Sequence, residues 1–320
     1  MKATRSPWNR PRAAANVLAL MSLIVVGSTA FDTIETPHGN AADCLGGSST
    51  YFSLAARLFT TVRLVSVVGT DFPDAHRKLL QDRGIDISGV ETKTGKTFRW
   101  HGRYASDMNS RQTLDVQLNT FGDFKPKVPT AFRDTPFVFL ANGSPGTQAS
   151  VLEQMQAPKF CVADTMDLWI EHEREGLLAL CKRIDGLIVN DSEVKQLTGK
   201  SNLIQAGRAA LALGPKLVIV KKGEHGCFVF SNFFHYALPA YPTESVVDPT
   251  GAGDSFAGGF MGYLANCDSV SLWNMKRAVA YGTVTASLTV EGFGVERIAR
   301  ADRETVERRY QELQQFVGGA

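Results

Sequence analysis

The sequence lacks the cysteine and histidine patterns that mark disulfide-rich or zinc-binding proteins. Its 320 residues include five cysteines, none in a C-x-x-C pair, and six histidines, none in an H-E-x-x-H motif. Neither sign of charge is in excess, since 34 Lys and Arg stand against 32 Asp and Glu, which argues against a nucleic-acid-binding protein. With 44% hydrophobic and 21% charged residues, the composition is that of a soluble, intracellular globular protein.

Two well-known nucleotide-binding motifs are incomplete or absent. The segments 95–97 (G-K-T) and 199–201 (G-K-S) match the end of a P-loop, but Val90 and Val194 stand where its first glycine is required. No G-x-G-x-x-G follows the first expected strand, which argues against an oxidoreductase that binds a dinucleotide. Any nucleotide chemistry must therefore use another motif.

The N-terminus has no apolar run long enough to span a membrane. The stretch Val17–Val26 is well short of the ~20 residues that a spanning helix needs. In one interpretation, the basic start, this apolar stretch and the small residues near Ala30 form a signal peptide. We favour the other, in which Ser22–Val26 is a buried strand and Met21 is the true start. Residues 1–20 would then be a disordered leader or a mis-annotated start, and the protein is expected in the cytoplasm.

Apolar stretches alternate with amphipathic helical stretches through residues 21–320. This alternation is typical of βαβ units and predicts one α/β domain with a mainly parallel sheet. Strands are expected at Leu23–Val26, Arg63–Val68, Phe137–Leu140, Phe160–Ala163, Gly186–Val189 and Leu217–Val220. Helices are expected at Ser49–Phe59, Ala75–Arg83, Leu168–Arg183, Leu203–Leu213, Asp254–Ala265, Leu272–Leu288 and Val306–Phe316.

Two polar, irregular stretches interrupt this pattern, Asp32–Cys44 and Thr92–Phe124. Short pieces of each alternate with a period of two, which predicts antiparallel strands with one solvated face. The two stretches can meet as one small sheet beside the main one. Such a sheet would form a lid at the C-terminal ends of the parallel strands, where ligands of these folds bind. The alternative, a pair of ordinary surface hairpins, is equally compatible with the spacing.

The segment 248–254, D-P-T-G-A-G-D, carries the strongest chemical signal. Its glycines precede an expected helix and let a substrate approach backbone N–H groups that form a natural anion site. A carboxylate there would repel phosphate, unless Asp254 takes a proton from an attacking hydroxyl while the amides of Gly251, Ala252 and Gly253 hold the developing charge. The alternative is that Asp254 only caps the helix. The surrounding glycines favour the catalytic interpretation.

With the residues that follow it, this segment resembles the C-terminal signature of the ribokinase-like (PfkB) family of carbohydrate and nucleoside kinases. Four more segments resemble family motifs in the same order: 27–32 (G-S-T-A-F-D), 45–50 (L-G-G-S-S-T), 190–193 (N-D-S-E) and 222–226 (K-G-E-H-G). Together they cover roughly residues 22–288. The resemblance implies a three-layer α/β/α fold with a mainly parallel central sheet and a small β-sheet lid, here contributed discontinuously by residues 32–44 and 92–124.

The resemblance also implies an activity and a set of site residues. The γ-phosphate of ATP would pass to a hydroxyl, usually a primary CH₂OH, with Asp254 as the base and the amides of 251–254 as the anion hole. The residues implied for the acceptor are Asp32, Gly46 and Gly47. Those implied for ATP are Asn190, Lys222, Gly223, Gly226, Gly251 and Gly253. Glu193 would order water around Mg²⁺, and Asp248 and Thr250 would hold a monovalent cation such as K⁺.

Each of these residues also has a purely structural interpretation. Asn190 and Glu193 fit the first turn of a helix, whereas Asp32 and Asp248 fit turn carboxylates. The joint occurrence of the motifs favours function for Asn190, Glu193 and Asp32. For the cation at Asp248, both interpretations stay open.

The acceptor is less well specified than the reaction. Many sugar-kinase members of the family carry Asn where Tyr51 stands. Phe98 and Trp100 share one face of an expected strand, and their rings could cover a nucleobase by stacking on it. The segment around them resembles bacterial nucleoside kinases related to adenosine kinase. We therefore expect a nucleoside, with a free sugar as the alternative acceptor and a catalytically silent sensor as the alternative function. Both a monomer and a homodimer through the lid are compatible with the sequence.

Overall fold

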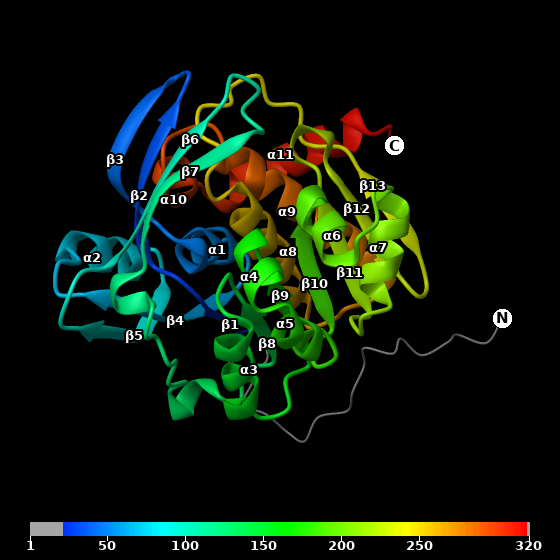
Figure 1. Cartoon of the computed structure of the whole chain (residues 1–320). Helices are drawn as coiled ribbons and strands as arrows, with labels where there is room; N and C mark the ends of the chain where they lie inside the picture. Colours follow the sequence, from blue (N-terminus) through cyan, green and yellow to red (C-terminus); the bar gives the residue numbers. More distant parts are fainter. Residues whose placement is uncertain (1–21, 319–320) are drawn as a thin grey trace.

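The computed structural model describes residues 22–318, so the predictions for residues 1–20 lie outside it. Two sheets, of nine and four strands, organise the chain (Figure 1). The strands are β1 (Ser22–Val26), β2 (Ala30–Thr36), β3 (Gly39–Gly46), β4 (Thr61–Gly69), β5 (Ile85–Lys93), β6 (Phe98–Tyr104), β7 (Arg111–Gln117), β8 (Phe137–Leu140), β9 (Phe160–Asp164), β10 (Gly186–Asn190), β11 (Leu217–Lys221), β12 (Cys227–Ser231) and β13 (His235–Leu238). The α-helices are α1 (Ser48–Ala56), α2 (Asp74–Asp82), α3 (Pro145–Gln154), α4 (Asp167–His172), α5 (Arg174–Cys181), α6 (Asp191–Thr198), α7 (Leu203–Leu211), α8 (Ala252–Cys267), α9 (Leu272–Thr289), α10 (Glu296–Arg300) and α11 (Arg303–Phe316).

The nine-stranded sheet is parallel except at one edge. Its order is β13-β12-β11-β10-β9-β8-β1-β4-β5, and only the β11–β12 and β12–β13 pairs are antiparallel. All six strands expected from the sequence lie in this sheet, which confirms the fold class. Their continuous apolar runs follow from burial on both faces. The strands at its two edges, β5 and β13, mix exposed and buried residues, and the apolar-run criterion therefore missed them.

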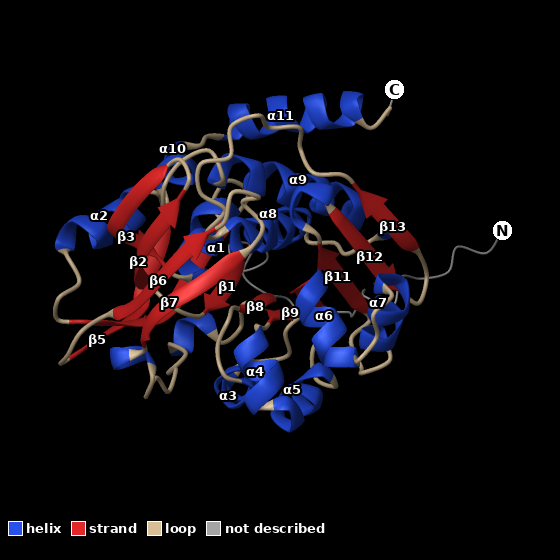
Figure 2. Cartoon of the chain, turned by 45° about the horizontal axis from the view of Figure 1, so that its top comes forward, coloured by secondary structure: helices blue, strands red, loops and turns tan. Residues whose placement is uncertain are grey.

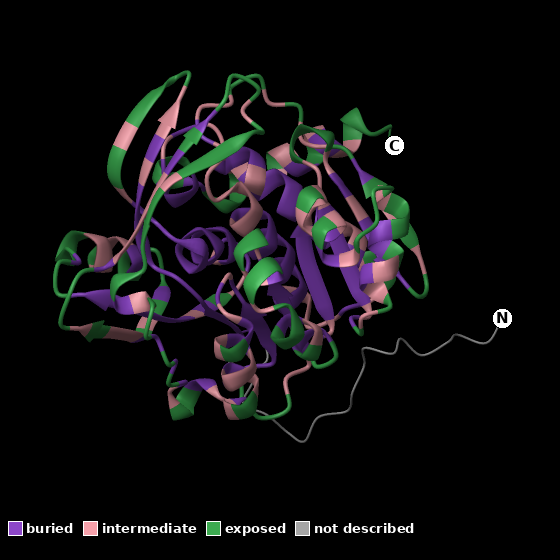
Figure 3. Cartoon of the chain, in the orientation of Figure 1, coloured by how far each residue is buried: buried purple, intermediate pink, exposed green. Residues whose placement is uncertain are grey.

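Helices cover both faces of the sheet and give the molecule three layers (Figure 2). Helices α1, α8 and α9 lie on one face, and α3 to α7 lie on the other. Alternate residues of β1 divide between the two apolar cores: Leu23 and Val25 join the first, whereas Ile24 and Val26 join the second. Figure 3 shows the parallel strands as buried along most of their length. The sheet thus forms a rigid base whose strand ends can position side chains.

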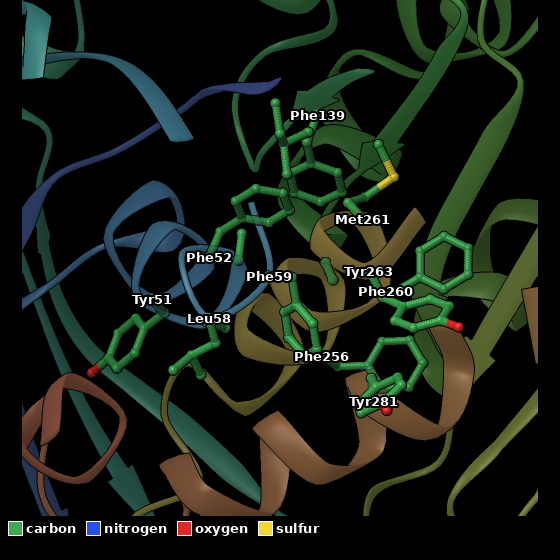
Figure 4. Packing of buried hydrophobic residues seen from close by; sticks show 14 of the residues in the cluster. Tyr51, Phe52, Leu58, Phe59, Phe139, Phe256, Phe260, Met261, Tyr263 and Tyr281 are labelled. Atoms are coloured by element: carbon green, nitrogen blue, oxygen red, sulfur yellow. The ribbon is translucent and has the colours of Figure 1, made fainter. Parts of the chain in front are cut away.

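Helix α8 packs at close range between α1 and α9. A Cβ atom on Gly258 would overlap the carbonyl oxygen of Phe52 in α1, and one on Gly259 would overlap the hydroxyl of Thr285 in α9. Figure 4 shows Phe52 and Phe256 among the large apolar side chains gathered around these helices. The small residues of α8 are therefore a packing requirement. They fix the position of its first turn, which carries the D-P-T-G-A-G-D segment.

The small sheet has the order β3-β2-β6-β7 and contains the two irregular stretches. The prediction of antiparallel pairing was right for β2–β3 and β6–β7 but wrong for the central pair, because β2 and β6 run parallel. The reason is topological. In the chain, β2 follows β1 and β6 follows β5. Because β1 and β5 run in the same direction in the main sheet, β2 and β6 also leave that sheet in the same direction. Residues 92–93 belong to β5 of the main sheet.

The expected helix Leu168–Arg183 is two helices, α4 and α5. The backbone of Glu173 leaves the helical region, with φ −128° and ψ 35°, and ends α4. The apolar spacing continues across the break because Ile170 and Leu177 bury in the same core. Periodicity therefore could not reveal this break.

Candidate active site

The first turn of α8 begins two residues earlier than the sequence suggested. Gly251 is the N-cap, with φ +74°, so Asp254 is the third residue of the helix and does not cap it. The N–H of Ala252 donates to the carbonyl oxygen of Pro249 at 3.1 Å. The N–H of Gly253 has no acceptor within residues 22–318 and remains available to an anion. Helix capping therefore does not explain Asp254.

The carboxyl group of Asp254 is buried and has a raised pKa. Burial is the largest cause that raises its pKa, Lys221 and Arg111 lower it, the charge of Glu193 raises it, and the net pKa is about 7. No residue in the range 22–318, Lys221 and Arg111 included, forms an ion pair with this carboxylate. A base with a pKa near the working pH, and without a structural partner, is suited to accepting a proton from a substrate.

The lysine nearest to this turn is Lys221, which the sequence reasoning missed. Its ammonium lies against Gly253, where an added Cβ would stand 2.5 Å from Nζ. The predicted residue, Lys222, instead places Nζ over the ring of Phe228, 3.8 Å from the centroid. Alternation along a strand sends adjacent side chains to opposite faces, and this signal could have separated the two lysines.

A second carboxylate, Asp32, lies buried at the end of the small sheet nearest α1. The hydroxyl of Tyr51 donates to Asp32 Oδ2 at 3.4 Å. Burial raises the pKa of Asp32 to about 7; the N–H of Gly47 lowers it, and the charges of Asp248 and Asp254 raise it. Asp32 and Asp254 therefore influence each other, although 222 residues separate them in the sequence.

The two glycines after β3 are explained by the position of Asp32. A Cβ on Gly46 would overlap the Asp32 carboxylate. Gly47 is the N-cap of α1 with φ +92°, and a Cβ there would lie 2.5 Å from the carbonyl oxygen of Ser28. The structure thus brings Asp32, Gly46 and Gly47 together, as expected for one binding region.

The substitution Gly46→Ala should displace Asp32 and weaken acceptor binding specifically. Hydrogen bonds to a charged group contribute about 1.5–3 kcal/mol, so we expect the KM for the acceptor to rise by about tenfold or more while the KM for ATP stays unchanged. Steady-state kinetics with each substrate varied in turn measure both values. Gly146→Ala, whose Cβ would meet no atom closer than 3.9 Å, is the matched control. An unchanged acceptor KM in Gly46→Ala would contradict this role of Asp32.

The two aromatic residues expected to cover the acceptor have different environments. Trp100 pairs in register with Asp32 on the adjacent parallel strand, so both side chains lie on one face of the small sheet. Arg111 places its guanidinium 5.7 Å from the centroid of the Trp100 ring. Phe98 instead stacks on Phe121, with 5.5 Å between ring centroids. Trp100 is therefore the better candidate for contact with the acceptor.

Tyr51 connects the acceptor side to the turn before α8. Its hydroxyl bonds to Asp32, and its ring fills the space that a Cβ on Gly251 would need. Figure 4 shows the hydroxyl at the outer edge of the apolar cluster. The sequence reasoning noted Tyr51 only as a departure from the sugar-kinase pattern. Its contact with both predicted regions required the three-dimensional structure.

The N-D-S-E motif forms a capping box at the start of α6. Asn190 Oδ1 accepts from the N–H of Glu193 at 2.8 Å, and Glu193 Oε2 accepts from the N–H of Asn190 at 2.7 Å. Burial raises the pKa of Glu193. The structural interpretation of these two residues is thus present. The capping box is compatible with the predicted role at the phosphates. Both residues lie near a cation that could share a phosphate with them, since Lys221 pairs with Asn190 in the neighbouring strand and acts electrostatically on Glu193.

The G-x-x-G turn follows β11 at the same end of the sheet. Gly223 has φ +55° and Gly226 has φ +75°, and both conformations favour glycine. The turn is touched by the hairpin between β6 and β7, since Asn109 Nδ2 donates to Glu224 Oε1 at 3.1 Å. The small sheet therefore extends from the acceptor residue Asp32 to the turn predicted for ATP.

Each carboxylate oxygen of Asp248 accepts a hydrogen bond from a backbone N–H group. One of its carboxylate oxygens accepts from the N–H of Thr250 at 2.8 Å, and the other accepts from the N–H of Gly294 at 2.9 Å. The Thr250 hydroxyl donates to the hydroxyl of Tyr104 in β6 at 3.2 Å. Asp248 thus ties the turn before α8 to the loop after α9, which is the turn-carboxylate interpretation. A monovalent cation at these residues stays a prediction.

The residues of this region suit a magnesium ion that arrives with a nucleotide. Within residues 22–318, no group of three or more His, Cys, Asp or Glu is arranged to hold a metal ion. Mg²⁺ often uses only one or two carboxylates together with substrate phosphates and water. The Glu193 carboxyl at the start of α6 fits that limited role.

Comparison with known proteins decides the family. The sequence profile described as pfkB family carbohydrate kinase matches residues 23–301. The chain belongs to this family. The match spans the main sheet, the small sheet and α8, so both predicted regions of this pfkB family member lie inside it.

Relatives of this pfkB family member include nucleoside kinases. It is 30% identical over 248 residues to a cytidine kinase of Thermococcus kodakarensis, with 76% of this chain and 88% of that protein covered. It is 28% identical over 310 residues to a nucleoside kinase of Methanothermobacter thermautotrophicus, covering 89% and 94%. Its fold is similar to that of Cryptococcus neoformans ribokinase solved with ADP, with a TM-score of 0.74, 21% identity, and 90% and 99% covered. None of the helices in residues 22–318 has the length and apolar content to cross a membrane.

Proposed function

We propose that this protein transfers the γ-phosphate of ATP to a hydroxymethyl group of a nucleoside. The observation that carries the proposal is the position of Asp254. This carboxyl lies in the first turn of α8, next to the available N–H of Gly253 and within electrostatic reach of Asp32. A base, an anion site and an acceptor-binding carboxylate thus lie together at one end of the sheet.

The proposed reaction assigns a task to each group. Asp254 removes the proton of the acceptor hydroxyl as the hydroxyl oxygen forms a bond to the γ-phosphorus. The bond between this phosphorus and the bridging oxygen breaks, and its electron pair leaves with ADP. The N–H groups of Gly251 and Gly253 stabilise charge on the oxygens of the transferred group. Asp32 holds the acceptor by accepting hydrogen bonds from its hydroxyls.

A nucleoside suits the acceptor side better than a free sugar. Trp100 lies on the same face of the small sheet as Asp32 and offers a ring for a base, and base–aromatic stacking contributes about 1–3 kcal/mol. Relatives named cytidine kinase and nucleoside kinase support this choice. The Tyr51 hydroxyl donates to Asp32 Oδ2, where the additional hydroxyl of a free sugar would otherwise donate.

The proposal includes the other components of the reaction. Mg²⁺, when bound, neutralises phosphate charge, and Glu193 would hold it through water while Asn190 lies near the phosphates. Asp248 and Thr250 would hold K⁺ behind the anion hole. A cytoplasmic location, where ATP is supplied, goes with this activity. Both a monomer and a homodimer through the small sheet are compatible with it.

A coupled ADP-release assay over a panel of acceptors tests the proposal. The panel holds adenosine, inosine, guanosine, cytidine, ribose and fructose, each with Mg²⁺ and with or without K⁺. We expect at least one nucleoside to give a kcat/KM at least ~10-fold above that of any free sugar. Higher turnover with a sugar would select the sugar-kinase alternative. ATP binding without turnover on any acceptor would select the sensor.

A further inference from the structure

Lys221 is a cation at the centre of the candidate site. It is the last residue of β11 and pairs in register with Asn190, the last residue of β10. Its ammonium lies against Gly253 in the first turn of α8. It therefore lies between the N-terminal ends of α6 and α8, two helix ends that favour anions.

Acidic groups surround this ammonium without forming an ion pair with it. Lys221 lowers the pKa of Asp254, Glu193 and Asp164, so its charge reaches all three. Within residues 22–318, however, the Lys221 ammonium forms neither an ion pair nor a hydrogen bond with any of them. Its three N–H donors are thus uncommitted, although the side chain is half-buried.

Asp164 is a buried carboxyl group within reach of the same charge. It ends β9, only 6% of it is exposed, and its Oδ1 atom has no hydrogen-bond partner among the described residues. Burial raises its pKa well above the usual range. A buried carboxyl oxygen without a direct partner costs free energy unless a ligand or water completes its bonding, and the half-buried Lys221 ammonium beside it is free to bind the same ligand.

We propose that the Lys221 ammonium binds the phosphoryl group that is being transferred. The inference rests on the kinase function proposed above and adds a catalytic residue to it. Lys221 donates hydrogen bonds to oxygens of that group on the side of Gly253. As the bond to the bridging oxygen breaks and its electron pair leaves with ADP, the positive charge stabilises the transferred group, while the proton of the acceptor goes to Asp254. Lys221 itself neither gains nor loses a proton.

The competing role is a structural one, in which Lys221 only offsets the charges of nearby acids. Its loss would then lower stability and affect all ligands alike. A phosphate-binding role makes a different prediction: the effect should depend on how many phosphates the nucleotide carries. Lys222 cannot take this role in the same conformation, because its ammonium lies over the Phe228 ring.

The experiment compares Lys221→Met and Lys221→Arg with the wild type. Lys200→Met is the matched control, because it removes one positive charge from an exposed loop residue between α6 and α7. We expect Lys221→Met to lower kcat by at least ~10²-fold, as loss of a donor at a developing charge does elsewhere. Binding of a non-hydrolysable ATP analogue should weaken about tenfold by calorimetry, with AMP and acceptor binding unchanged. Lys221→Arg should recover part of kcat, and Lys200→Met should match the wild type.

The outcomes that would overturn the proposal are equally specific. A kcat of Lys221→Met within threefold of the wild type would do so, as would equal weakening of the ATP analogue and AMP. If Lys221→Met does not fold in a thermal melt, Lys221→Gln takes its place. If the wild type phosphorylates no acceptor, the kinase function fails. The difference between analogue and AMP binding then still decides whether Lys221 binds phosphate.

Discussion

Replacing Asp254 with Asn should lower kcat at least ~10²-fold while leaving ATP affinity within a few-fold of the wild type. The substitution keeps the shape of the side chain and removes its ability to accept a proton, which is worth about 10²–10⁴ in rate for a general base. Nucleotide affinity should persist because the N–H of Gly253 and the turn at 223–226 are unchanged. Single-turnover kinetics and calorimetry with an ATP analogue measure the two quantities separately.

A matched control for this substitution is Asp82→Asn. Asp82 is exposed at the end of α2, and among residues 22–318 it pairs only with Lys78, four residues earlier in the same helix. It should retain full activity. Full activity of Asp254→Asn would remove the base from the mechanism. A fall in ATP affinity as large as the fall in kcat would instead assign Asp254 to nucleotide binding.

The main sheet was predictable because its strands are buried on both faces. Runs such as Leu23–Val26 and Leu217–Val220 are apolar at every position. At that length, a strand buried on both faces fits such a run better than a buried helix does. The turn that leads into α8 was predictable for a different reason, with the helix start placed two residues too late. Its Asp-Pro pair, glycines and acid place strong local restrictions on the backbone. Both features are encoded in residues adjacent in sequence.

Other features of the site depend on contacts between distant segments. The parallel pairing of β2 with β6 is set by the direction in which β1 and β5 leave the main sheet. The choice between Lys221 and Lys222 depends on which face of β11 meets α8. Alternation along the strand separates the two lysines, but local sequence does not tell which face of β11 meets α8 or how β2 and β6 pair.

Tyr51 illustrates why acceptor preference was the least predictable property. A single side chain contacts Asp32 through its hydroxyl and Gly251 through its ring. Those residues come from β2 and from the turn before α8, which meet only in the folded protein. A substitution at Tyr51 would therefore alter the acceptor side and the anion hole together, and sequence spacing could not show this coupling.

The acid limb of the pH profile should report two carboxyl groups. The pKa values of Asp254 and Asp32 are both raised to about 7, chiefly by burial, and the proposed reaction needs both as carboxylates, one to take a proton and one to accept hydrogen bonds from the acceptor. A group with a raised pKa is protonated as the pH falls through that value, so activity is expected above pH 7 and lost below it. Each of the two protonations lowers kcat/KM about tenfold for every pH unit below the pKa of its group.

The two groups can be separated because kcat/KM for the acceptor reflects the free enzyme. Its logarithm should fall below pH 7 with a limiting slope near two in the wild type and near one in Asp32→Asn, which keeps only the Asp254 ionisation. Two pH units below the midpoint, the wild type should have lost about 10⁴-fold and the variant about 10²-fold of its own plateau value. Circular dichroism at each pH checks that the fold persists. A wild-type profile that stays flat to pH 5 would show that neither carboxyl has the pKa that its burial implies, and the base would have to be sought elsewhere.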